Sequence, residues 1–155
     1  MGAEVSVAVR SEVAASGLAI APGPIRELLE RSLAFLPGPV ARVHLEIVGD
    51  AEMIRLHRVH SGQPGTTDVL TFPAHAGGEP IEVDIVACAD EAARRAAEFG
   101  HAVDRELLLY AIHGLLHCCG HDDHEPEAHE RMHAEEDRIL RALGVGATFR
   151  PEGRP

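Results

Sequence analysis

The sequence predicts an α+β domain in which a small mixed sheet of about four strands is covered by helices. Segments of alternating apolar residues are interspersed with longer segments whose apolar residues recur at helical spacing. A chain of 155 residues, 45% of them hydrophobic, is long enough to bury a core and too short for two ordinary domains. We therefore expect residues 1–143 to form one domain. Residues 144–155, rich in Gly, Pro and Arg, are expected to be a disordered tail.

The alternating segments and their turn residues place the expected elements in order along the chain. The predicted strands are residues 5–10, 43–47, 69–72 and 81–88. Pro22-Gly23-Pro24 predicts a turn before an amphipathic helix over residues 25–36, and Asp50 is a suitable N-cap for the next helix. Further helices are expected from residue 89 or 90 to 99, from about 104 to 117, and from 127 to 143 after Pro126.

The helix expected over residues 104–117 is the most apolar and should be central in the fold. It carries His113 and His117 four residues apart, which places both imidazoles on one helical face, about 6 Å apart along the axis. Gly120 can take the left-handed conformation that ends a helix and turns the chain back. The return brings further His and Asp residues within reach, so the segment can supply the three ligands of a zinc site.

The residue after the first histidine distinguishes this site from that of a zinc protease. Proteases with H-x-x-x-H spacing carry a glutamate there as general base, whereas this chain has Gly114. A zinc ion held by imidazoles and at most one carboxylate lowers the pKa of bound water to about 7 and so needs no dedicated base. This chemistry fits metal-hydroxide hydrolysis of a phosphodiester.

Three sequence blocks together resemble the YbeY family of bacterial endoribonucleases. Residues 113–122 read H-G-x-L-H-x-x-G-x-D, residues 67–73 are similar to the family's T-D-V-L-S-F-P, and residues 83–85 to its G-D-I strand. The resemblance implies a small sheet, a buried central helix and a metal at the bottom of a cleft. It also implies a zinc-dependent, single-strand-specific endoribonuclease, with one Zn²⁺ per chain, that acts in 16S rRNA 3′-end maturation and ribosome quality control. His113 and His117 would be its metal-binding and catalytic residues.

The third metal ligand is where the chain departs from the family pattern. The usual motif ends G-Y-D-H, with a histidine ten positions after the first, and here that position is Asp123, followed by His124. Spacing favours Asp123, and ligand type favours His124 because imidazole suits zinc and keeps the site more positive. Both remain candidates, with His124 slightly favoured. His121 is expected to be a solvent-facing neighbour of the site.

A second departure concerns the contact with RNA. The family often has an arginine in the loop before T-D-V-L, and here the corresponding residue is Ser61. Arg58, on the preceding helix, is the candidate RNA-binding residue, although a solvated helix charge is the favoured interpretation. Asp68 is a candidate to hydrogen-bond a metal-ligating histidine and so orient its ring, or else it is a turn carboxylate. Asp84, in an apolar strand, should be paired.

The remaining charged and thiol residues favour ordinary structural roles. His129 and His133 also lie four residues apart, but neighbours that include Glu135 and Glu136 indicate a solvated helix face and argue against a second metal. The cysteines Cys88, Cys118 and Cys119 are interpreted as reduced residues of the core.

The net charge, the absence of targeting segments and the family resemblance bear on the expected partners and location of the protein. The formal net charge of −11 is unusual for a nuclease, so local basic residues or a partner must promote contact with phosphates. The N-terminus lacks the pattern of a signal peptide and no apolar run reaches transmembrane length. The resemblance implies RNA (a 16S rRNA precursor or defective ribosomes) as partner, with possible ribosomal or GTPase proteins, and neither DNA nor membrane.

Two other function classes fit the same residues. One is a metal-dependent hydrolase of a peptide or amide, which the absence of a glutamate at position 114 disfavours. The other is a non-catalytic ribosome-associated factor with structural zinc, for which Cys118 or His121 would supply a fourth ligand.

Overall fold

A four-stranded mixed sheet is the framework of the computed structural model, which describes residues 2–121 and 124–146. The strand order is β1-β2-β4-β3; β1, β2 and β4 run parallel, and β3 pairs antiparallel with β4. The strands are β1 (Glu4–Val9), β2 (Val40–Val48), β3 (Val69–Pro73) and β4 (Ile81–Cys88). The predicted α+β class with a small mixed sheet covered by helices is thus confirmed.

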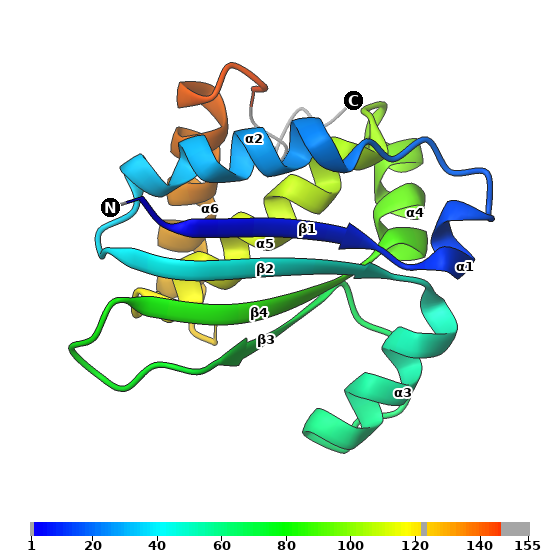
Figure 1. Cartoon of the computed structure of the whole chain (residues 1–155), viewed down its shortest axis with the longest axis horizontal. Coiled ribbons are helices and arrows are strands. Elements are labelled where there is room, and N and C mark those ends of the chain that lie inside the picture. The colour runs from blue at the N-terminus through cyan, green and yellow to red at the C-terminus, as the bar shows by residue number, and fades with distance from the viewer. Residues whose placement is uncertain (1, 122–123, 147–155) are drawn as a thin grey trace.

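Helices cover both faces of this sheet, unequally (Figure 1). Helix α5 packs on β3 and β4, helix α2 on β1, and helices α4 and α6 on α5, whereas α3 contacts β4 and α4. The helical segments are α1 (Ser11–Ala14), α2 (Pro22–Ser32) with a 3₁₀ turn η1 (Leu33–Phe35), α3 (Asp50–Ser61), α4 (Ala89–Phe99), α5 (Val103–Cys118) and α6 (Pro126–Ala142).

The alternation of side chains along β4 divides the core into two clusters. Val83 and Ile85 belong to the larger cluster, under α2, α4, α5 and α6, whereas Val86 and Cys88 belong to a smaller cluster with Met53 of α3. Successive strand residues point to opposite faces, so β4 must bury apolar side chains on both faces. This explains why β4 is continuously apolar from Ile85 to Cys88, whereas exposed Glu82 and Asp84 alternate with apolar residues in its first half.

Two element boundaries differ from the sequence-based expectation. Pro22-Gly23-Pro24 forms the first turn of α2 instead of a turn before it, because proline without an N–H is well suited to the first helical position. Asp50 is the first residue of α3 and Gly49 is its N-cap, so the expected capping role of Asp50 is wrong. The short helix α1 was not expected from the sequence.

Helix α5 is the central helix, as predicted. Nine of its 16 residues are buried, and it packs against the sheet, α2, α4 and α6. Within the described part of the chain, no helix combines the length and the hydrophobicity that crossing a membrane requires. The predicted single domain of residues 1–143 stays a prediction. Most of the expected tail, residues 147–155, lies outside the described residues.

Candidate active site

The C-terminal end of α5 places the two motif histidines side by side. The rings of His113 and His117 have centroids 4.8 Å apart and meet edge to face at 83°. The helix then ends in a Schellman motif, in which Gly120 N–H donates to the His117 carbonyl and His121 N–H to the Leu116 carbonyl. Gly120 has φ +96°, which glycine adopts without strain. The predicted helix end and chain reversal are therefore present.

Gly114, between the two histidines, lies against the sheet. A Cβ at this position would be 2.7 Å from Thr71 Cγ2 of β3 and 3.1 Å from Ile85 Cδ1 of β4. The absence of a side chain therefore lets α5 approach the sheet closely, while His113 and His117 occupy another helical face. A glutamate base of the protease type would have to enter this packed contact, which adds a physical reason to the sequence argument against a protease.

A buried glutamate of α6 holds His113 in place. Glu136 is 1% exposed, and its Oε2 lies 2.5 Å from His113 Nδ1. Its other oxygen, Oε1, lies 2.9 Å from His133 Nδ1. Burial raises the pKa of the Glu136 carboxyl, but the hydrogen bonds from the two histidines outweigh burial and leave the pKa below its usual value.

The tautomer of His113 follows from this contact. An ionised carboxylate only accepts hydrogen bonds, so His113 donates from Nδ1–H and would ligate a metal through Nε2. The sequence interpretation of Glu136 as part of a solvated face was wrong. A signal was present, since Met132, Glu136, Ile139 and Leu140 recur at helical spacing and share the buried face of α6.

The remaining predicted ligands lie at or beyond the limits of the described chain. His124 is exposed, and Asp123 lies outside the described residues. His121 is half-buried and borders a pocket of about 680 Å³ that also contacts Gly120 and Arg131. The choice between Asp123 and His124 as third ligand stays open.

The candidate residues outside α5 occupy positions with ordinary explanations. Arg58 lies exposed near the end of α3, where His60 packs on Phe72 of β3 with ring centroids 4.6 Å apart. Asp68 accepts hydrogen bonds from the Val69 N–H at 2.8 Å and from Thr67 at 3.4 Å.

The hydrogen bonds of Asp68 to its chain neighbours Thr67 and Val69 are those of a turn carboxylate. Among the described hydrogen bonds, none joins it to His113 or His117. Ser61, at the position of the family's loop arginine, donates to the His57 carbonyl at 2.9 Å. Asp84 pairs with Arg42 at 3.0 Å, as its strand position predicted.

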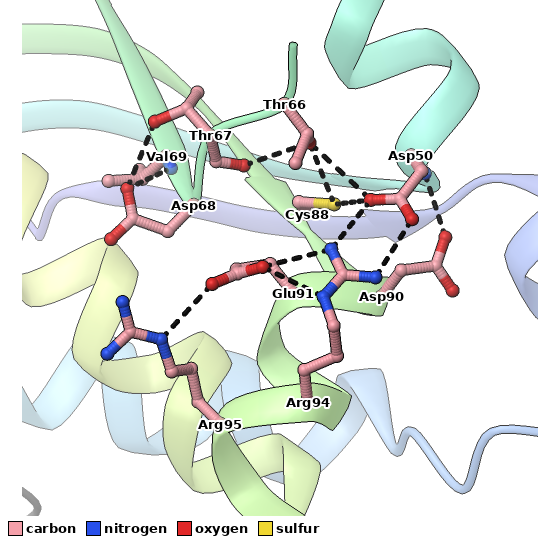
Figure 2. A network of polar contacts seen from close by, with 10 residues as sticks. All are labelled: Asp50, Thr66, Thr67, Asp68, Val69, Cys88, Asp90, Glu91, Arg94 and Arg95. Carbon is pink, nitrogen blue, oxygen red and sulfur yellow. Dashed lines mark hydrogen bonds and ion pairs between the residues drawn. The ribbon is translucent and has the colours of Figure 1, made fainter.

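A polar network that the sequence did not indicate lies where β2 and β4 end and α3 and α4 begin (Figure 2). Potential ligand atoms of Asp50, Cys88 and Asp90 lie within 4.8 Å of one another, a spacing compatible with a metal ion. However, Arg94 already contacts both Asp50 oxygens, Oδ1 at 2.9 Å and Oδ2 at 3.0 Å. Asp90 accepts the Asp50 N–H at 2.8 Å and so caps α3 from a neighbouring helix.

This network has the properties of a structural tie. The hydrogen bonds of Arg94 hold the pKa of the Asp50 carboxyl below its usual value, against the opposing effect of burial. Burial raises the pKa of the Cys88 thiol to about 11, so the thiol within this network is protonated at neutral pH. Arg94 provides the positive charge that the carboxylates need, and the network joins α3 to α4.

Comparison with known proteins places this geometry in a family. The family model described as endoribonuclease YbeY matches residues 24–144. The endoribonuclease YbeY of Anaeromyxobacter sp. (strain Fw109-5) is 40% identical over 136 residues, which cover 84% of this chain and 70% of that protein. The one from Mycobacterium tuberculosis (strain ATCC 25618 / H37Rv) is 38% identical over 113 residues, which cover 66% of this chain and 64% of that protein.

A further relative and a solved structure agree. The endoribonuclease YbeY of Symbiobacterium thermophilum is 36% identical over 133 residues, which cover 78% of this chain and 85% of that protein. The solution structure of TM1509 from Thermotoga maritima matches with a TM-score of 0.52 and 26% identity, covering 86% of this chain and 91% of that one. The family-model match thus includes strands β2, β3 and β4, the central helix and the histidine motif, and the chain belongs to the endoribonuclease YbeY family.

Proposed function

We propose that this protein is a zinc-dependent endoribonuclease that cleaves single-stranded RNA in 16S rRNA 3′-end maturation and ribosome quality control. Membership of the endoribonuclease YbeY family supports a nuclease of the hydrolase class. The observation that carries the metal dependence is the pair of His113 and His117 at the end of α5, with the Glu136 carboxylate behind His113. Such carboxylate–histidine pairs are typical of metal sites.

The residues present fit a zinc ion. His113 and His117 would hold it with His124 or Asp123, and Glu136 fixes the ring of His113. When bound, zinc supplies Lewis acidity, which lowers the pKa of a water ligand to about 7 and offsets negative charge on a phosphoryl group. Because a metal lowers the pKa of its bound water, the proposed chemistry needs no general base after His113, and Gly114 is compatible with it.

Contact with RNA must overcome the net charge of −11. Arg58 is exposed and forms no ion pair with the residues that the structure describes, so its charge is available to phosphate. Arg131 borders the pocket of about 680 Å³ beside the motif turn and offers a second positive charge. We propose that these arginines, helped by ribosomal or GTPase partner proteins, position RNA in the cytoplasm, with no role for DNA or a membrane.

Cleavage of single-stranded and double-stranded RNA by the zinc-loaded protein tests the proposal. We expect cleavage of the single strand alone, and loss of both cleavage and bound zinc in His113→Ala and His117→Ala. His44→Ala, in β2, is the matched control because it removes an imidazole whose partners are Ser6 and Glu46 and not residues of the motif. No cleavage of any of several RNAs by zinc-loaded protein would contradict the proposal.

Zinc content can identify the third ligand. If His124 is the ligand, His124→Ala loses zinc and Asp123→Ala keeps it; the reverse result assigns Asp123. Retention of zinc when both are changed would contradict a ligand set drawn from this segment.

A further inference from the structure

We infer that His129 and His133 of α6 form a second binding site for a divalent transition metal, separate from the site proposed at His113 and His117. The two Nε2 atoms lie 3.0 Å apart. Two imidazole nitrogens bound to one tetrahedral zinc at 2.0–2.1 Å are separated by about 3.3 Å. The separation is thus within a few tenths of an ångström of the required one, and a turn of the rings that points both Nε2 lone pairs at one ion would complete the arrangement.

His129 and His133, the outer pair, repeat the geometry of His113 and His117, the inner pair. The ring centroids of His129 and His133 lie 4.3 Å apart at an interplanar angle of 83°, against 4.8 Å and 83° for His113 and His117. Both pairs have a spacing of four residues on a helix. In both pairs, one ring is fixed through Nδ1 by an oxygen of Glu136, Oε2 for His113 and Oε1 for His133.

Glu136 sets the tautomer that a metal requires. Because its carboxylate accepts from His133 Nδ1–H, the neutral ring of His133 presents the lone pair of Nε2 toward His129. His129 Nε2–H then donates the hydrogen bond that joins the two rings. On metal binding this proton moves through solvent to His129 Nδ1, so the ring stays neutral and both Nε2 lone pairs become available to the ion.

The surroundings limit which ion can bind. His129 is exposed and the side chain of His133 is 20% exposed, so an ion can reach the pair from solvent and complete its coordination with water. Imidazole ligands suit Zn²⁺, Ni²⁺ and Cu²⁺, whereas Mg²⁺ prefers oxygen ligands. We therefore expect affinity to rise from Co²⁺ through Ni²⁺ to Cu²⁺, with Zn²⁺ below Cu²⁺, and Mg²⁺ not to compete.

Titration of the full-length apo protein with Zn²⁺ by calorimetry tests this inference. We expect two equivalents, of which His129→Gln loses the weaker one and keeps the stronger. His129→Gln leaves Glu136 and both of its hydrogen bonds untouched, and Glu130→Gln, the next residue on α6, is the matched control, expected to keep both equivalents. A single equivalent at millimolar Zn²⁺, or a second one that survives in His129→Gln, would overturn the inference.

A spectroscopic measurement distinguishes this site from the inner one. In ¹H–¹⁵N spectra of the imidazole rings, the second equivalent should shift the Nε2 resonances of His129 and His133, also in a His117→Ala background that removes a ligand of the first site and leaves both hydrogen bonds of Glu136 in place. Shifts confined to His113 and His117 would overturn the second site and leave the proposed nuclease site intact. Conversely, an inactive protein with shifted His129 and His133 resonances would contradict the nuclease proposal alone.

Discussion

Glu136 of α6 and His113 of α5 are joined by a 2.5 Å contact between Oε2 and Nδ1, although they are 23 residues apart in sequence. A carboxylate that is 1% exposed is stable only when both oxygens are paired, and His113 and His133 provide the two donors. The pairing also fixes α6 against the end of α5. Glu136 thus serves both the fold and the orientation of a proposed metal ligand.

Replacing Glu136 by Gln should weaken both the fold and metal binding. Glutamine has one acceptor oxygen for two Nδ1–H donors, so one histidine loses its partner, at a cost of about 1–3 kcal/mol in the free energy of unfolding. We expect zinc affinity to fall about 10- to 100-fold, as for other groups that support a ligand. Denaturant unfolding and zinc titration measure the two effects.

The neighbouring Glu135→Gln is the control for this change. It removes an exposed ion pair with Arg138 and should alter both quantities little. If Glu136→Gln behaved like Glu135→Gln, the assigned role of Glu136 would be wrong.

Gly114→Ala should destabilise the protein despite alanine's higher helix propensity. The added Cβ would lie 2.7 Å from Thr71 Cγ2, closer than packed carbon atoms approach. Overpacking of this kind costs about 1–3 kcal/mol, more than the roughly 1 kcal/mol that propensity returns. The free energy of unfolding should therefore fall, and no loss of stability would contradict the close contact of α5 with the sheet.

The contact with Thr71 can be tested by compensation. Thr71→Ser removes Cγ2, so Gly114→Ala should be less destabilising in a Thr71→Ser background. Rescue should be partial because Ile85 Cδ1 would remain 3.1 Å from the new Cβ. Equal costs in both backgrounds would show that Thr71 is not the obstacle.

The helices, the strands and the histidine-bearing end of α5 could be predicted because each depends on residues that are close together in the sequence. The spacing of His113 and His117 and the glycine at 120 determine one helical face and one helix end. Contacts between distant segments were beyond such patterns. The role of Glu136 depends on how α6 packs on α5, and that of Arg94 on how α3 packs on α4. From sequence alone, a charged residue is interpreted as solvated because its partner in the folded chain is unknown.

The pair of Asp50 and Arg94 predicts a dependence of stability on acid pH. Hydrogen bonding to Arg94 depresses the pKa of Asp50 in the folded state below the usual 3.8. Between the folded and the unfolded pKa the unfolded state binds more protons, so this contribution is present above 3.8 and is lost as the pH falls through the folded pKa.

Asp50→Asn should remove that part of the pH dependence. The free energy of unfolding of the variant should fall less steeply than that of the wild type below pH 3.8, while Glu30→Gln, in an exposed pair of α2, should keep the wild-type slope. Identical slopes for Asp50→Asn and the wild type would contradict the assignment.

Cys118→Ser should retain the bound zinc if the ion is held by histidines and one further ligand of the motif turn. Cys118 follows His117 on the helix and so lies about 100° around it from that ligand, and it packs against the larger core cluster, where burial raises the pKa of its thiol to about 11. Zinc content after dialysis should therefore match that of the wild type, with His117→Ala as the variant that loses it. Loss of zinc in Cys118→Ser would instead indicate a closed site with a fourth protein ligand, and would favour a structural role for the metal over catalysis.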